Sequence, residues 1–182
     1  MGTKKETKPA DAPSVSTARL YFEKFTGPNS LAILNSLLAT HPKTFENEWL
    51  DFKSGKVQTG DIARIWSKAL GAFANNEGGV IVWGIQAKKL DGVDAAHAVE
   101  PVPNVEVLAS QLQEQFRFAL DPPLLGVEIK PVPLSDSAKE GFVVCFVPEG
   151  TQKPHKSVNA ERPFYVRVGD EAKEPSVSLL RQ

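Results

Sequence analysis

Three carboxylates and a lysine lie within one short segment of the chain. Glu46, Glu48 and Asp51 precede Lys53 in the stretch Glu-Asn-Glu-Trp-Leu-Asp-Phe-Lys. Carboxylate oxygens are the ligands that hard divalent cations prefer, and a lysine beside them can neutralise a carboxylate or contact a phosphate. The segment therefore predicts either a metal site or a solvated strand end with a local ion pair.

We expect residues 45–53 to form this strand. Strict alternation places Glu46 and Glu48 on one face of a strand and Asp51 on the other. A regular strand therefore separates the acids, unless a bulge turns one of them. From spacing alone, the solvated strand end is the favoured interpretation.

A helix over residues 60–75 follows, with apolar residues at the i, i+3, i+4, i+7 positions of one face. Arg64 and Lys68 lie four residues apart, away from that stripe, and so share the exposed face. The helix ends at Asn-Asn-Glu-Gly-Gly (75–79), and the apolar run 80–85 predicts a central strand. The turn could offer backbone N–H groups to an anion, but no Gly-Lys-Ser/Thr follows, so a phosphate loop is not indicated.

The remaining segments alternate between helix and strand patterns. We expect a helix at 31–38, a polar loop at 88–103 with a turn at Asp91-Gly92, a helix at 104–120, a hairpin of strands 127–130 and 142–147, and a last strand at 164–168. This order predicts an α+β (mixed α/β) class: a single compact domain with a mixed central sheet and about three helices.

The domain organisation follows from composition. Residues 1–17 carry almost no large apolar side chain and predict a disordered tail. Residues 18–44 predict a docking segment and a helix, and residues 45–182 the main domain.

Basic and aromatic side chains alternate near the end of the chain. Lys153 and Lys156 precede Arg162, Tyr165 and Arg167. Such interleaving suits phosphate contact combined with base stacking. The alternative is ordinary strand alternation, in which Tyr165 and Arg167 face solvent while their neighbours pack inward.

Composition limits the remaining classes. The net charge of -1 does not indicate a nucleic-acid binder by itself, although a local basic patch can still attract phosphate. The single cysteine, Cys145, excludes an internal disulfide, and His41, His97 and His155 lack metal-ligand spacing and predict surface residues. No membrane span or secretion signal is evident, so we expect a cytoplasmic protein without membrane contact.

Taken together, these motifs resemble the Schlafen-type, Alba-like DNA-binding domain family, formerly called a divergent AAA-type domain. Five segments carry the resemblance in order: 46–53, 71–79, 82–85, 153–156 and 164–169. The resemblance covers about residues 30 to 180. It implies association with nucleic acid, either DNA or RNA, through a module that is regulatory or targets a larger system. The predicted nucleic-acid-binding residues are Lys53, Arg64, Lys68, Lys153, Lys156, Arg162, Tyr165 and Arg167.

The resemblance also implies an alternative, because some members are metal-dependent endoribonucleases that act on structured RNA. Their carboxylates correspond to Glu46 and Asp51, which are therefore the catalytic and metal-ligating candidates for Mg²⁺ or Mn²⁺. Ala87 stands where the third acid of that pattern belongs, and Asp91 could substitute only from the loop. We therefore rank binding above cleavage. ATP binding ranks third, and the two-lobed cores of Schlafen proteins add a protein-interaction or homodimerisation role.

Overall fold

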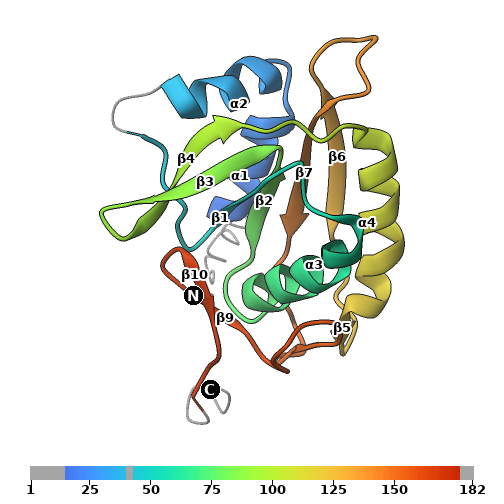
Figure 1. The fold of residues 1–182 in the computed structure, drawn as a ribbon. Helices are drawn as coiled ribbons and strands as arrows, with labels where there is room; N and C mark the ends of the chain where they lie inside the picture. The colour runs from blue at the N-terminus through green and yellow to red at the C-terminus, as the bar shows by residue number, and fades with distance from the viewer. Residues whose placement is uncertain (1–14, 40–42, 177–182) are drawn as a thin grey trace, which may run out of the picture.

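The computed structural model describes residues 15–39 and 43–176, which are built around a four-stranded sheet (Figure 1). The strand order is β1-β2-β7-β6, with β1 parallel to β2 and the other two pairings antiparallel. The strands are β1 (Leu50–Lys53), β2 (Gly79–Trp83), β6 (Glu128–Pro133) and β7 (Gly141–Val147). The predicted mixed sheet and the β6–β7 hairpin are confirmed.

Helices cover both faces of this sheet in the described part of the chain. They are α1 (Thr17–Thr26), α2 (Ser30–Ala39), α3 (Thr59–Ala74) and α4 (Val105–Ala119). Alternation along β2 sends Ile81 and Trp83 into the core beneath α3 and α4, and Val80 and Val82 into the core beneath α1 and α2. The α+β class is confirmed, with four helices among the described residues in place of about three.

The additional helix is α1, where the sequence predicted only a docking segment. The Ser16 side chain caps it by accepting a hydrogen bond from the backbone N–H of Arg19 at 3.2 Å. Phe22 and Phe25 of α1 are buried together with Leu34 and Leu37 of α2 in the core on that face of the sheet. Both N-terminal helices therefore contribute to one of the two hydrophobic cores that flank the sheet.

Of the predicted tail, residues 1–14 lie outside the described residues, and Thr17 is the first residue of α1. Among the helices that are described, none is long and apolar enough to cross a membrane.

Three small two-stranded sheets complete the fold. They are β3 (Ile85–Leu90) with β4 (Val93–Val99), β5 (Leu120–Asp121) with β8 (Lys156–Ser157), and β9 (Val166–Val168) with β10 (Glu171–Lys173). The predicted turn at Asp91-Gly92 is present, but the predicted loop around it is wrong, because the flanking residues pair as β3 and β4. Their polar side chains gave no alternating apolar pattern, since much of this hairpin is exposed.

Candidate nucleic-acid-binding cleft

A tight turn brings Glu46 and Asp51 together, and the prediction of a regular strand from residue 45 is wrong. Asn47 and Leu50 exchange backbone hydrogen bonds of 3.1 and 3.3 Å, and the Asn47 side chain accepts a further bond from the backbone N–H of Trp49. The chain therefore reverses before β1 begins. Glu46 folds back onto β1, where its Oε1 accepts a 2.8 Å bond from the backbone N–H of Phe52. Glu48 is exposed and takes no part.

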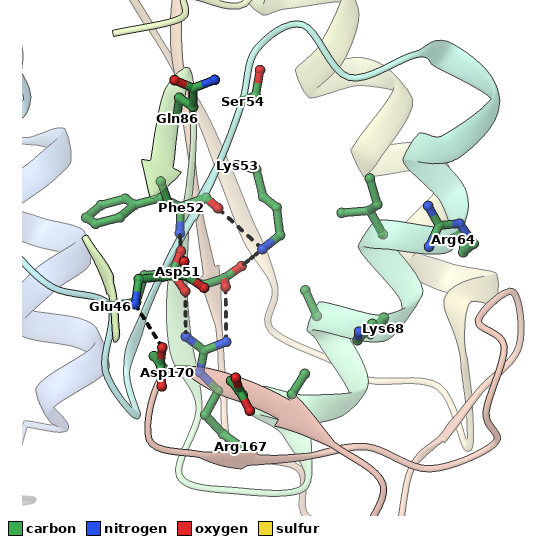
Figure 2. A pocket seen from close by; sticks show the side chains of 16 residues that line it. Glu46, Asp51, Phe52, Lys53, Ser54, Arg64, Lys68, Gln86, Arg167 and Asp170 are labelled. Atoms are coloured by element: carbon green, nitrogen blue, oxygen red, sulfur yellow. Dashed lines mark hydrogen bonds and ion pairs between the residues drawn. The ribbon is translucent and has the colours of Figure 1, made fainter. Parts of the chain in front are cut away.

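The guanidinium of Arg167 lies between these two carboxylates (Figure 2). Its Nη1 is 3.0 Å from Asp51 Oδ1, and its Nη2 is 3.4 Å from Glu46 Oε2. Lys53 contributes a second cation, with its Nζ 2.5 Å from Asp51 Oδ2. The expectation that Tyr165 and Arg167 face solvent is wrong, because both residues are buried.

The Asn75-Asn76 turn at the end of α3 explains this burial. The Asn76 side chain accepts a 2.9 Å bond from the backbone N–H of Arg167 and donates a 3.0 Å bond to the Arg167 carbonyl. Asn75 similarly holds His155 and Tyr165 through their backbone groups. The two amides thus fasten the C-terminal segment to the end of α3, which turns Arg167 toward β1.

His155, predicted to be a surface residue, is buried by the same arrangement. Only 1% of it is exposed, and its Nδ1 lies 2.7 Å from the carbonyl oxygen of Pro122. The prediction is therefore wrong for this histidine, because the backbone contacts of Asn75 draw it inside.

A polar cleft of about 610 Å³ opens beside the ion cluster. Its walls come from α3, β1, the β3–β4 hairpin and the β9–β10 hairpin (Figure 2). Asp170, in the turn between β9 and β10, accepts a 2.9 Å hydrogen bond from the backbone N–H of Asp94 on β4. This bond ties the two hairpins together along one side of the cleft.

Sequence reasoning missed several residues that line the cleft. They are Gln86, Asp94, Asp170 and Glu171. The available sequence signal was the glycine in the turn of each polar hairpin, Gly92 and Gly169. These glycines mark the two hairpins that bring the missed residues to the cleft.

The two acids of the cluster titrate in opposite directions. Burial, reinforced by the charge of Asp51, raises the pKa of Glu46 to about 8, although Lys53, Phe52 and Arg167 act against the rise. Burial would also raise the pKa of Asp51, but the charges and hydrogen bonds of Lys53 and Arg167 outweigh it and lower that pKa. At neutral pH the cluster therefore favours an ionised Asp51 and a protonated Glu46.

Four of the predicted nucleic-acid-binding cations line the cleft: Arg167 of the ion cluster, together with Lys53, Arg64 and Lys68. Lys53 extends from β1 toward α3, which contributes Arg64 and Lys68 (Figure 2). Arg64 forms ion pairs with Asp61 at 3.2 Å and Glu161 at 2.9 Å. Among the described residues, Lys68 has no carboxylate partner, and its ammonium lies 5.3 Å from the centre of the Tyr165 ring.

The other predicted cations lie outside the cleft. Lys153 pairs with Glu149 at 2.7 Å and also donates to the carbonyl of Asn76. Lys156 is exposed on β8, and Arg162 lies 3.7 Å from Glu174. The structure thus divides the predicted basic set into a cleft group and an outer group on the segment after β7.

A family model described as "Schlafen, AlbA_2" matches residues 46–176, the segment that builds this cleft. The chain belongs to this family.

Two solved structures resemble this Schlafen/AlbA_2 chain at low identity. One is the DIP2311 protein from Corynebacterium diphtheriae, with 18% identity, a TM-score of 0.43, and coverage of 79% of this chain and 26% of that one. The other is the N-terminal domain of a protein related to the ATP-dependent DNA helicase RecG, from Nitrosomonas europaea, with 22% identity, a TM-score of 0.46, and coverage of 81% and 91%. The chain thus spans about a quarter of the first of these proteins. No curated protein matches it.

The donor set of this Schlafen/AlbA_2 cleft does not fit a divalent metal. Glu46 and Asp51 are both engaged by Arg167, and Ala87 offers no side-chain oxygen. Of the other acids that line the cleft, Asp170 accepts the backbone N–H of Asp94, and Glu171 pairs with Lys89 and Lys173. Asp91 lies in the β3–β4 turn and does not line the cleft. Within the part of the chain that the structure describes, no group of three or more acidic, histidine or cysteine side chains is placed to hold a metal ion.

A Glu46→Gln variant is expected to flatten the pH dependence of stability between about pH 5 and pH 8. Glu46 ionises near 4.5 in the unfolded chain but keeps its proton to about 8 in the folded protein. The folded state therefore binds more protons in this window, so the free energy of unfolding falls as pH rises, by up to about 1.4 kcal/mol per pH unit.

Urea unfolding of both proteins at several pH values measures this slope. Asp51 does not mask it, because its lowered pKa confines its contribution to pH values near and below 3.8. Equal slopes in the wild type and the variant would show that Glu46 is not protonated in the folded state.

Proposed function

We propose that this Schlafen/AlbA_2 domain binds nucleic acid, DNA or RNA, through the cations of the cleft. The observation that carries the proposal is the position of Lys68 in the cleft wall. Its ammonium rests near the Tyr165 ring and has no carboxylate partner among the described residues. Arg64 lies one helical turn away and Lys53 reaches toward α3 from β1, so three cations surround one opening.

Lys53, Arg64 and Lys68 form the part of the cleft wall that suits phosphate, whereas Asp94, Asp170 and Glu171 on the two hairpins would repel it. Lysine and arginine side chains that neutralise phosphates release condensed counterions, which drives binding without any sequence readout. The exposed ion pairs of Arg64 are worth only about 0–1 kcal/mol each, so a phosphate can replace Asp61 or Glu161 as its partner. The overall charge of -1 means that attraction comes from this local group and not from the whole molecule.

The outer group extends the proposed surface along the chain that follows β7. Lys153, Lys156 and Arg162 are exposed and could contact phosphates beyond the cleft. Tyr165 and Arg167 are buried, so we infer that they contribute indirectly. Tyr165 supports Lys68, and Arg167 fixes β9 against β1. In this role the domain would target a larger system to nucleic acid.

A Lys68→Gln variant is expected to bind nucleic acid several-fold more weakly than the wild type. Loss of one phosphate contact should also reduce the slope of log K against log salt by roughly 0.7–0.9. Fluorescence anisotropy with single- and double-stranded DNA and RNA, titrated at several salt concentrations, measures both quantities.

The matched control is Lys24→Gln, which removes an exposed lysine from α1 on the other face of the sheet. That variant should bind like the wild type. Absence of binding to all four nucleic acids at low salt would overturn the proposed function, and equal weakening by both variants would overturn the cleft as its location.

Cleavage is the less supported alternative, because the donor set does not fit a metal. Gel analysis of transfer RNA recovered from the same binding mixtures, with and without Mn²⁺, tests it directly. Cleavage by the wild type that is lost in a Glu46→Gln, Asp51→Asn variant would show that the domain is a nuclease and not only a nucleic-acid-binding module.

A further inference from the structure

Arg167 places a positive charge between Glu46 and Asp51, at a position where the two acids would otherwise attract a metal cation from solution. The Arg167 guanidinium contacts Glu46 on one side and Asp51 on the other, and only 3–4% of each of these side chains is exposed. Two carboxylates that share one buried cation are the arrangement that a divalent metal would otherwise stabilise.

Every oxygen of the two carboxyl groups already has a contact. Glu46 Oε1 accepts the backbone N–H of Phe52 and its Oε2 faces Arg167. Asp51 Oδ1 faces Arg167 and its Oδ2 faces Lys53. A metal coordinates such oxygens at about 2.0–2.6 Å, so it would have to displace these partners and then lie beside the positive charges of the buried Arg167 and the partly exposed Lys53.

Arg167 is also held too firmly to swing aside. Its side chain donates to the carbonyl oxygens of Asn47 at 3.2 Å and Leu50 at 3.0 Å, in addition to the two carboxylates. Its backbone N–H and carbonyl are both held by Asn76, and its guanidinium lies 5.0 Å from the centre of the Phe73 ring. Displacement would leave several buried polar groups without partners, which is costly.

We propose that Arg167 takes the place of a divalent cation in this domain, so that the cleft is a metal-independent site. The guanidinium supplies the positive charge between Glu46 and Asp51 and at the same time links β9 to the turn before β1. Ala87 is consistent with this role, because this position of the cleft wall adds no further acidic side chain beside Glu46 and Asp51. The inference does not depend on the proposed function, since metal binding is measured without nucleic acid.

The test is paramagnetic broadening of an assigned amide spectrum by Mn²⁺ alone. In the wild type, the amide signals of residues 46–53 should broaden no more than those beside exposed carboxylates such as Asp136. Selective broadening of the Leu50 and Phe52 signals would overturn the proposal.

Two variants sharpen the result. Ala87→Asp alone adds the missing carboxylate but keeps Arg167, and it should gain no selective broadening. Ala87→Asp combined with Arg167→Ser removes the internal cation and should gain it. Mn²⁺ binding by the single variant would show that Arg167 does not occupy the cation position, and a folded double variant without binding would also count against the proposal. If the double variant does not fold, Mn²⁺ broadening in the wild type and in the single variant still tests the proposal.

Discussion

Replacing Arg167 with methionine is expected to lower the free energy of unfolding by about 3–5 kcal/mol, the range found when one partner of a buried ion pair is removed. Methionine retains much of the side-chain volume but none of the donors. Asp51 would remain buried with only Lys53 as a countercharge, and the carbonyl oxygens of Asn47 and Leu50 would lose their donor. Urea unfolding followed by tryptophan fluorescence measures the loss.

The matched control is Arg64→Met. Arg64 also contacts two carboxylates, but its side chain is 40% exposed, compared with 3% for Arg167. Exposed pairs are worth about 0–1 kcal/mol, so this variant should unfold almost like the wild type. Similar losses in the two variants would show that burial of Arg167 does not determine its contribution.

A coupled variant separates the charge from the packing. In a Glu46→Gln, Asp51→Asn background the buried negative charge is already absent, so Arg167→Met should cost much less than it does in the wild type. The difference between the two costs is the coupling energy of the cluster. Equal costs in both backgrounds would indicate that Arg167 acts through packing alone.

The parts of the fold that could be predicted from sequence are those in which one apolar periodicity dominates. The stripe of α3 and the fully apolar runs of β2 and β7 each face a core, and their patterns predicted both type and position. The β3–β4 hairpin was missed for the opposite reason. Its residues from Lys88 to Leu90 are exposed, so no alternation marks the strand, and only Asp91-Gly92 signalled a turn.

The candidate site was predicted in its residues but not in its geometry. Glu46, Asp51, Lys53 and Arg167 were all named, yet alternation along a regular strand separates the two acids. The turn at Asn47 is what joins them, and it is closed by two backbone hydrogen bonds and one side-chain hydrogen bond that periodicity cannot show. The burial of Arg167 likewise depends on Asn76, which lies about ninety residues away in sequence.

Replacing Asn75 with aspartate is the second change that we expect to be strongly destabilising, by about 2–4 kcal/mol. The Asn75 side-chain N–H₂ group donates to the carbonyl oxygens of His155 and Tyr165, both at 2.9 Å. An aspartate has the same shape but no donors, so two carbonyls would lose a partner and face a carboxylate instead. Asn75 is also the C-cap of α3, where a negative charge opposes the helix dipole.

Asn159→Asp is the control, because it makes the same chemical change at an exposed position. It should leave the free energy of unfolding within about 0.5 kcal/mol of the wild type. Hydrogen exchange locates the effect of Asn75→Asp, since amides of residues 155–167 should lose protection first if Asn75 fastens that segment to α3. Uniform loss of protection across the whole domain would instead mean that Asn75 stabilises α3 itself and that the segment carrying Arg167 is held by other contacts.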